Sequence, residues 1–139
     1  AGLPVIGTLR DLIDTGDRIE RIEGIFSGTL AYLFNRFDGA APFSELVRQA
    51  KQAGYTEPDP RDDLSGLDVA RKLVILAREM GLDIGLDDVR VESLVPPELE
   101  GASIEGFLGG LNCLDEPMKQ RLEAARAGHQ VLRYCAVLE

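Results

Sequence analysis

Four stretches of the sequence carry apolar residues at helical spacing, and each of them is followed by a glycine. They predict helices over residues 3–15, 43–53, 65–80 and 115–127, which end at Gly16, Gly54, Gly81 and Gly128. Glycine ends helices readily, because it adopts the left-handed conformation at little steric cost. This punctuation restricts the chain to helices of about three to four turns and favours a largely helical fold.

Two other stretches favour strands. Residues 18–26 are rich in isoleucine and lead into turn glycines, and residues 131–138 are apolar at alternating positions on both faces. The second pattern is typical of a strand buried on both sides. Further short helices are expected over residues 27–37 and from Ser103. The predicted fold class is α+β, with a few-stranded sheet covered by several helices.

The length and the ends of the sequence favour a segment of a larger protein. A chain of 139 residues is the size of one domain. It starts at Ala1 directly before a helix and stops at Glu139, just after a strand that needs neighbours. We therefore expect a truncated domain of a two-domain protein. The alternative is that the first residues were processed and that the final strand is an edge strand.

The charge and the rare residue types exclude several functions. The net charge is −9, and the acids are spread along the chain, which argues against a nucleic-acid partner. Cys113, Cys135 and His129 form no metal-binding or disulfide pattern, which suits a reducing compartment. No apolar run approaches the roughly 18 residues of a membrane span. We expect a cytoplasmic protein that has no membrane partner.

The densest chemical signal is the run from Gly54 to Lys72. Four carboxylates crowd its first part, and Pro58 and Pro60 stiffen the backbone that carries them; these are Glu57, Asp59, Asp62 and Asp63. Fixed φ angles lower the entropy cost of holding these groups in place. Residues 55–64 are expected to be irregular, and such a loop can bind an amine, a cation or a helix N-terminus.

Two nearby features could complete a site. Asp68 and Lys72 share a helix face at a spacing of four residues; they are either a solvated ion pair worth roughly 0.3–0.5 kcal/mol or a partly buried acid–base pair. Ser27, Gly28 and Thr29 open a helix whose N–H groups could hold a carboxylate or phosphate, or could simply be capped by Ser27. A dinucleotide-binding G-x-G-x-x-G motif is missing from the sequence.

Taken together, these residues resemble homoserine dehydrogenase. The resemblance is strongest from Gly54 to Lys72, and it extends to residues 1–4, 15–17, 24–29 and 131–134. It covers nearly the whole chain, least clearly residues 83–128. The continuation over residues 73–79 looks most like the bifunctional enzymes in which an aspartate kinase precedes the dehydrogenase.

The resemblance implies an oxidoreductase that interconverts aspartate 4-semialdehyde and homoserine with NAD(P)H, on the route to threonine, methionine and isoleucine. It implies that Lys72 is the acid–base residue. Thr29, Glu57, Asp63 and Asp68 would hold the amino-acid substrate. Carbonyls of Ala1 and Leu3 would be two ligands of a sodium site.

Residues 1–139 would be the substrate-binding and catalytic domain, without the nucleotide-binding region, and no cofactor-binding residue can be named. We expect the isolated chain to be inactive and the enzyme to be a dimer. The alternative is a non-catalytic module that binds an amine or a cation, or that serves dimerisation. Glu57, Asp68 and Lys72 are expected to converge beside the turn of Ser27 to Thr29.

Overall fold

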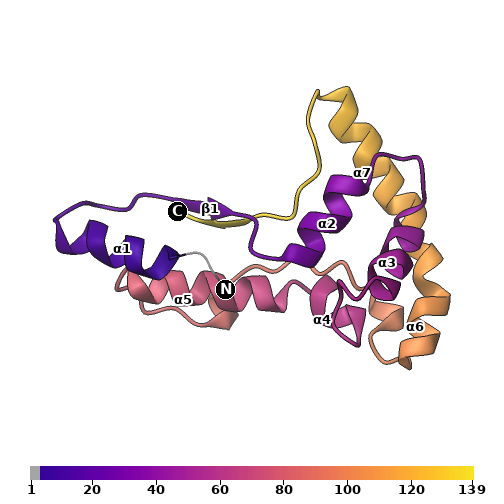
Figure 1. The fold of residues 1–139 in the computed structure, drawn as a ribbon, viewed down its shortest axis with the longest axis horizontal. Coiled ribbons are helices and arrows are strands. Elements are labelled where there is room, and N and C mark those ends of the chain that lie inside the picture. Colours follow the sequence, from indigo (N-terminus) through magenta and orange to yellow (C-terminus); the bar gives the residue numbers. More distant parts are fainter. Residues whose placement is uncertain (1–3) are drawn as a thin grey trace.

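The computed structural model describes residues 4–139, which form a largely helical α+β fold with one two-stranded sheet that lies beside the helix α5 (Leu67–Glu79) (Figure 1). Its α-helices are α1 (Val5–Asp14), α2 (Gly28–Arg36), α3 (Phe43–Gln52), α4 (Pro60–Leu64), α5 (Leu67–Glu79), α6 (Ile104–Gly110) and α7 (Asp115–Ala127). Three 3₁₀ turns span Leu86–Asp88, Pro97–Leu99 and Leu111–Leu114. The strands are β1 (Ile22–Gly24) and β2 (Ala136–Leu138). The predicted fold class is confirmed.

The helices expected from the glycine punctuation are present, with small shifts at their ends. Gly16, Gly54 and Gly81 all have positive φ angles directly after α1, α3 and α5. The start of α5 lies two residues later than expected, because Gly66 takes the left-handed conformation (φ 73°) immediately before it. Residues 55–64 are not wholly irregular, which corrects the prediction. Asp59 caps α4 and Pro60 occupies its first turn, a position that suits proline.

The sheet is shorter than expected. β1 and β2 pair antiparallel over three residues each, with Ile22 opposite Leu138 and Gly24 opposite Ala136. The prediction that residues 131–138 are buried on both sides is wrong. Ala136 is buried against α5, whereas Val137 is 41 % exposed and Val131 is 71 % exposed. One face of the ribbon is therefore covered and the other is open.

Most of the core lies at the opposite end of the molecule, among α2, α3, α4, α6 and α7, and it continues along α5 to Ala136 of the sheet (Figure 1). Phe43 at the start of α3 is fully buried and packs edge-on against Phe37, with ring centroids 5.3 Å apart. Asp115 of α7 accepts hydrogen bonds from both the backbone N–H and the hydroxyl of Ser44, each at 2.8 Å. This contact caps α3 from 71 residues away, since Pro42 before the helix has no side-chain cap to offer.

Helix α1 is attached more loosely. Only Leu9 of its apolar stripe is buried, and the rest of the stripe is more than a third exposed: Val5, Ile6, Leu12 and Ile13. Arg10 holds α1 to α5 through two hydrogen bonds to Glu79, at 2.7 and 2.9 Å. None of the helices described, from α1 to α7, is long and apolar enough to cross a membrane.

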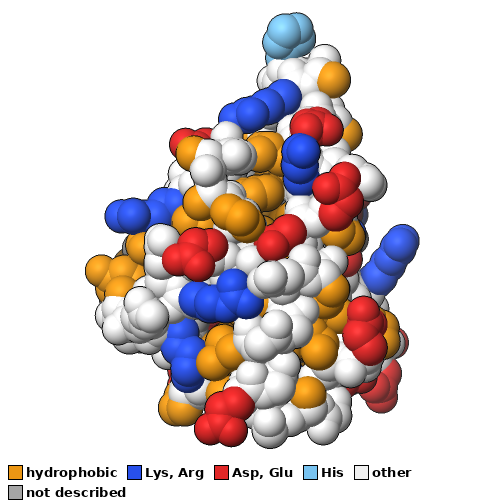
Figure 2. All heavy atoms as spheres, turned by 90° about the vertical axis from the view of Figure 1, so that its right-hand side faces the viewer, with side chains coloured by type: hydrophobic (Ala, Val, Ile, Leu, Met, Phe, Trp, Pro, Cys, Tyr) orange, Lys and Arg blue, Asp and Glu red, His pale blue; other side chains and the backbone are white. Residues whose placement is uncertain are grey.

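The face formed by the helical end is chemically mixed. Figure 2 shows basic and acidic side chains interspersed with apolar ones over this face, without a large area of one sign. Such a surface offers no continuous basic track for a nucleic-acid backbone.

Candidate functional site

The turn between β1 and α2 presents unused backbone donors. The hydroxyl of Ser27 accepts a hydrogen bond from the N–H of Leu30 at 3.1 Å, so Ser27 caps its own helix. Within residues 4–139, the N–H groups of Gly28 and Thr29 have no acceptor. They lie at the positive end of a nine-residue helix, where a carboxylate would be stabilised. The Ser27 cap and a ligand site at this turn are thus compatible.

Thr29 links this turn to the acidic loop. Its hydroxyl donates to the carbonyl of Tyr55 at 2.6 Å, across 26 residues of sequence. Farther along the loop, Asp63 Oδ2 accepts from the N–H of Glu57 at 2.8 Å. The carboxylate of Glu57 takes part in no hydrogen bond or ion pair with the described residues, which leaves it free for a ligand.

Lys72 lies one turn after Asp68 on α5, and its side chain reaches the turn between β1 and α2. Its Nζ donates to Asp68 Oδ2 at 2.6 Å and to the carbonyl of Phe26 at 2.9 Å. Of the two alternatives left open by the sequence, the structure favours the exposed pair, because the side chains of Lys72 and Asp68 are 45 % and 58 % exposed. They project away from the buried stripe of α5, which contains Val69 and Leu73. The ammonium therefore faces an open cleft and not the core.

A cavity of about 520 Å³ collects these groups. Its lining includes every residue that the sequence analysis assigned to catalysis or substrate binding, which are Thr29, Glu57, Asp63, Asp68 and Lys72. An adjoining cavity of about 390 Å³ shares Ser27 and three of the carboxylates with it. The first volume suits a small-molecule ligand. The expected convergence beside the Ser27–Thr29 turn is therefore present in the structure.

The structure adds two aromatic residues that the sequence analysis missed. Tyr32 and Tyr55 also line the larger cavity, and their ring centroids are 4.8 Å apart. The guanidinium of Arg36 lies 4.7 Å from the centroid of Tyr32. A signal for Tyr32 was available, because it follows Thr29 by three residues and so shares its helix face. The two proposed cation ligands, Ala1 and Leu3, lie outside the described residues.

Asp59 and Arg61 form an ion pair in the acidic loop that does not line either cavity. The guanidinium of Arg61 hydrogen-bonds the carboxylate of Asp59, and this contact holds the pKa of Asp59 below its usual range. The same pair raises the pKa of Arg61. Neither side chain is among those that line the two cavities. Their ion pair stabilises the conformation of the loop.

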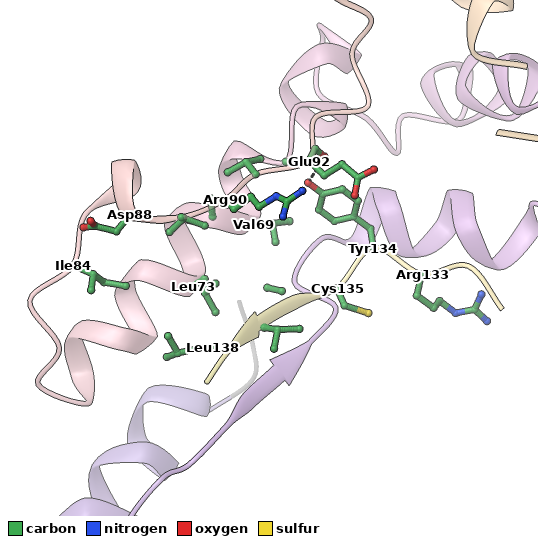
Figure 3. A pocket seen from close by; sticks show the side chains of 16 residues that line it. Val69, Leu73, Ile84, Asp88, Arg90, Glu92, Arg133, Tyr134, Cys135 and Leu138 are labelled. Carbon is green, nitrogen blue, oxygen red and sulfur yellow. Dashed lines mark hydrogen bonds between the residues drawn. The ribbon is translucent and has the colours of Figure 1, made fainter. Parts of the chain in front are cut away.

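A larger cavity lies elsewhere and contains none of the five candidate residues. It measures about 620 Å³ and is bounded by α5, the segment of residues 84–92 and the segment of residues 133–138 (Figure 3). The hydroxyl of Tyr134 donates to the carbonyl of Glu92 at 2.8 Å across one end of it. This hydrogen bond joins the segment of residues 84–92 to the segment of residues 133–138. Burial raises the pKa of Tyr134.

The turn at the start of α2 does not fit the diphosphate of a dinucleotide. The N-terminus of α2 follows a strand, but Glu57, Asp63 and Asp68 surround it, and their charge would repel a diphosphate. The turn also lacks the glycine spacing that lets a backbone approach a pyrophosphate closely. Over residues 4–139 there is likewise no group of three or more His, Cys, Asp or Glu residues placed to hold a metal ion.

Comparison with known proteins assigns the family. The model of the homoserine dehydrogenase family matches residues 4–139, nearly the entire chain. The chain belongs to the homoserine dehydrogenase family. This membership confirms the resemblance read from the Gly54–Lys72 run.

Named homoserine dehydrogenases are close in sequence. The chain is 65 % identical over 136 residues to a bifunctional aspartokinase/homoserine dehydrogenase of Escherichia coli, and covers 17 % of that protein. It is 52 % identical over 145 residues to a homoserine dehydrogenase of Emericella nidulans, and covers 39 % of it. In each case nearly all of this chain is matched. The chain thus spans well under half the length of these relatives.

Solved structures show the same fold. A Candida auris protein of unknown function superposes on the whole chain with a TM-score of 0.94 and 46 % identity, and the match covers 40 % of that protein. A putative homoserine dehydrogenase of Archaeoglobus fulgidus gives a TM-score of 0.70 and 26 % identity over 98 % of this chain, which is 36 % of the archaeal chain. The largely helical fold with its short sheet is therefore shared with these structures.

Proposed function

We propose that this chain is the amino-acid-binding and proton-transferring part of a homoserine dehydrogenase, which interconverts aspartate 4-semialdehyde and homoserine. The observation that carries the proposal is the convergence of Thr29, Glu57, Asp63, Asp68 and Lys72 on one cavity of about 520 Å³. These residues come from three helices, α2, α4 and α5, and from the loop before α4, and local structure alone does not require them to meet. A site for a small zwitterion explains why they do.

The charges of the cavity match the two ends of an amino acid. The carboxylates of Glu57 and Asp68 suit the substrate ammonium, and Glu57 is free of other partners among the described residues. The N–H groups of Gly28 and Thr29 suit the substrate carboxylate. Charge-assisted hydrogen bonds of this kind are short and about twice as strong as neutral ones. They would orient the reacting end of the substrate towards Lys72.

Lys72 can act on the substrate oxygen. An ammonium has three N–H donors, and two of them are used on Asp68 and on the Phe26 carbonyl. The third is available to a ligand in the cavity. When the aldehyde carbon is reduced, negative charge develops on its oxygen, and a proton from Lys72 neutralises it. In the reverse direction Lys72 accepts the proton of the homoserine hydroxyl. Such catalysis contributes typically about 10²–10⁴-fold.

NAD(P)H supplies the hydride in this reaction. Since the α2 turn does not fit a diphosphate, we assign the dinucleotide site to a part of the complete enzyme outside this cavity. Residues 1–139 would then be the substrate domain. An aspartate kinase domain that precedes it stays a prediction. A monovalent cation at Ala1 and Leu3 stays a prediction. The cytoplasmic location also stays a prediction, since relatives include chloroplastic proteins of Arabidopsis thaliana.

A second copy of the chain is the partner that we propose. The open face of the β ribbon carries Val137, which is 41 % exposed, and β2 pairs along one edge only in the described structure. Exposed strand edges tend to pair with another chain. This role is compatible with the enzymatic one. The alternative of a non-catalytic module that binds an amine or a cation stays a prediction.

Binding can be tested on the chain itself by NMR titration with L-homoserine. We expect shifts at the amides of Gly28, Thr29 and Glu57. N-acetyl-L-homoserine lacks the ammonium, and the amide of L-homoserine lacks the free carboxylate, so each should bind more weakly. Equal binding of all three compounds, or shifts confined to residues around the cavity at Tyr134, would contradict the proposed site.

A further inference from the structure

Arg61 makes the densest set of contacts in the acidic loop, yet its side chain lines neither cavity of the site. Its guanidinium donates several hydrogen bonds to the carboxylate of Asp59. Nη2 lies 2.6 Å from Oδ2, and Nε lies 3.0 Å from both carboxylate oxygens. The two side chains are 17 % and 25 % exposed. This geometry fixes the guanidinium plane, so that its remaining donors point in one direction.

Those donors reach a distant segment. Nη1 of Arg61 donates to the carbonyls of Leu99, Glu100 and Ala102, at 3.2, 2.9 and 2.7 Å. The guanidinium also lies 5.4 Å from the ring centroid of Phe107, which is fully buried in the core. One side chain therefore fastens the acidic loop to the turn at residues 97–102 and to α6.

The same loop carries the carboxylates of the cavity. Glu57 lies four residues before Arg61 and Asp63 lies two residues after it, and the bond from the Glu57 N–H to Asp63 closes the loop around it. Lys51 supports the other side through a 2.6 Å hydrogen bond to the carbonyl of Pro58. A shift of the Arg61 anchor would move both cavity carboxylates together.

We infer that Arg61 is a positioning residue: by joining Asp59 to the carbonyls of residues 99–102, it sets the position of Glu57, which faces the substrate ammonium, and of Asp63, which accepts the Glu57 N–H. This inference rests on the proposed function. Arg61 touches no reacting atom, and its effect is transmitted through the loop backbone. A misplacement of about 1 Å at a site can cost about 10²-fold in rate, so a firm anchor matters even at this distance.

A matched control exists on α3. Arg48 is also a bridging arginine, and its Nη2 donates to the carbonyl of Leu108 at 2.9 Å and to Asn112 Oδ1 at 2.7 Å. It joins α3 to α6 and the turn that follows, and it lines neither cavity. Replacing Arg48 removes a comparable bridge without touching the acidic loop. The Arg48 variant therefore distinguishes a general loss of stability from a displacement of Glu57 and Asp63.

The first test uses the chain itself and needs no activity. In Arg61→Met we expect the Glu57 N–H, whose acceptor is Asp63, to exchange with solvent at least about tenfold faster relative to the amides of α2. Arg48→Met should leave this ratio unchanged. Unchanged exchange of Glu57 in Arg61→Met, or equal acceleration in both variants, would overturn the inference. If Arg61→Met does not fold, Arg61→Lys carries the same test, because lysine keeps the charge and loses the planar guanidinium.

The second test uses the complete Escherichia coli relative with its matching segment replaced by residues 4–139. We expect Arg61→Met to raise the KM for homoserine about tenfold while leaving the KM for the dinucleotide within about twofold. Arg61→Lys should recover part of this loss, and Arg48→Met should change neither KM. If the parent chimera is active and Lys72→Ala abolishes that activity, an unchanged KM for homoserine in Arg61→Met overturns the inference about Arg61 and leaves the proposed function standing. If Lys72→Ala retains full activity, the proposed function itself fails.

Discussion

At the scale of single residues, Lys72 differs from an ordinary surface lysine in where its donors go. It bonds Asp68 on its own helix and the Phe26 carbonyl from the strand side, which pins the ammonium at the mouth of the cavity. A solvated i,i+4 pair alone would contribute only a few tenths of a kcal/mol, about 0.3–0.5, and would have no such second contact. The arrangement favours a chemical role for this side chain.

We predict that Lys72→Ala in the complete enzyme lowers kcat by about 10²–10⁴-fold and changes KM much less. The reason is that proton transfer to the substrate oxygen occurs in the transition state, whereas the ammonium and carboxylate of the substrate are held by other groups. Steady-state kinetics in both directions measures this. Lys119→Ala, on the exposed side of α7, is the control and should behave as the parent. Near-native kcat in Lys72→Ala would return Lys72 to the role of a solvated pair.

Asp59 gives a prediction about pH. Its pKa is held below the usual value of about 3.9 by the Arg61 hydrogen bonds, so it binds protons less readily in the folded state. The stability that it contributes is fully present above pH 3.9 and is lost as the pH falls through the lower folded pKa. We expect the difference in unfolding midpoint between the parent and Asp59→Asn to be nearly constant from pH 5 to about pH 4 and to shrink from there towards about pH 2. A difference that stays constant over this range would show that the ion pair contributes nothing.

At the scale of elements, Gly66 joins the acidic loop to α5 and sets the direction of that helix. Its φ of 73° lies in the left-handed region, and a Cβ there would come within 2.0 Å of the Tyr134 hydroxyl. Gly54 after α3 has nearly the same φ, 74°, but a Cβ there would have no neighbour within 4 Å. A comparison of the two positions thus distinguishes the cost of a positive φ from the cost of a steric clash.

We predict that Gly54→Ala lowers the free energy of unfolding by about 1–2 kcal/mol, the usual cost of the left-handed conformation. Gly66→Ala should cost at least about 1 kcal/mol more, because Tyr134 must move and its hydrogen bond to Glu92 is lost. Urea unfolding of both variants measures the difference. Equal losses would mean that Tyr134 can move aside freely, and that the contact at Gly66 does not constrain the helix.

At the scale of the whole molecule, two apolar surfaces are left open at the ribbon end. One is the stripe on α1, and the other is the outer face of the sheet, where Val137 lies. The helical end, in contrast, packs its large side chains closely around Phe43 and Phe107. The two ends of the chain therefore differ in how completely they bury their apolar groups.

We predict that the chain self-associates through its sheet, because β2 offers an unpaired edge beside an exposed valine. Light scattering over a micromolar concentration range should show a species larger than the monomer. Val137→Lys should shift it to the monomer, whereas Ile75→Lys, at an exposed position of α5, should not. A strictly monomeric parent would contradict the prediction.

We also predict that the isolated chain catalyses no homoserine-dependent reduction of NAD(P). The cavity residues favour an amino acid and repel a diphosphate, and the sequence has no phosphate-binding glycine loop. A spectrophotometric assay of the purified chain is sufficient, with the segment-exchanged Escherichia coli enzyme as the positive control. Turnover by the isolated chain would show that a dinucleotide site exists where we find none.

The sequence by itself determined the features that depend on neighbours a few residues apart. The glycines placed the ends of α1, α3 and α5, and the spacing of Asp68 and Lys72 put both on one helix face. The Gly54–Lys72 run also indicated the family. These features follow from interactions that close within one or two turns of a helix, which a sequence displays directly.

Tertiary structure decided what joins distant segments. The two strands pair over only three residues each. Before β2, the side chains of Arg133 and Tyr134 donate to the carbonyls of Phe34 and Glu92, so this segment packs on other parts of the chain. The cap of α3 by Asp115 and the anchoring of Arg61 on residues 99–102 link positions about 40 to 70 residues apart. Thr29 reaches the cavity of Lys72 in the same way. Such contacts form only after long loops have closed, and their cost and geometry depend on the entire packed chain.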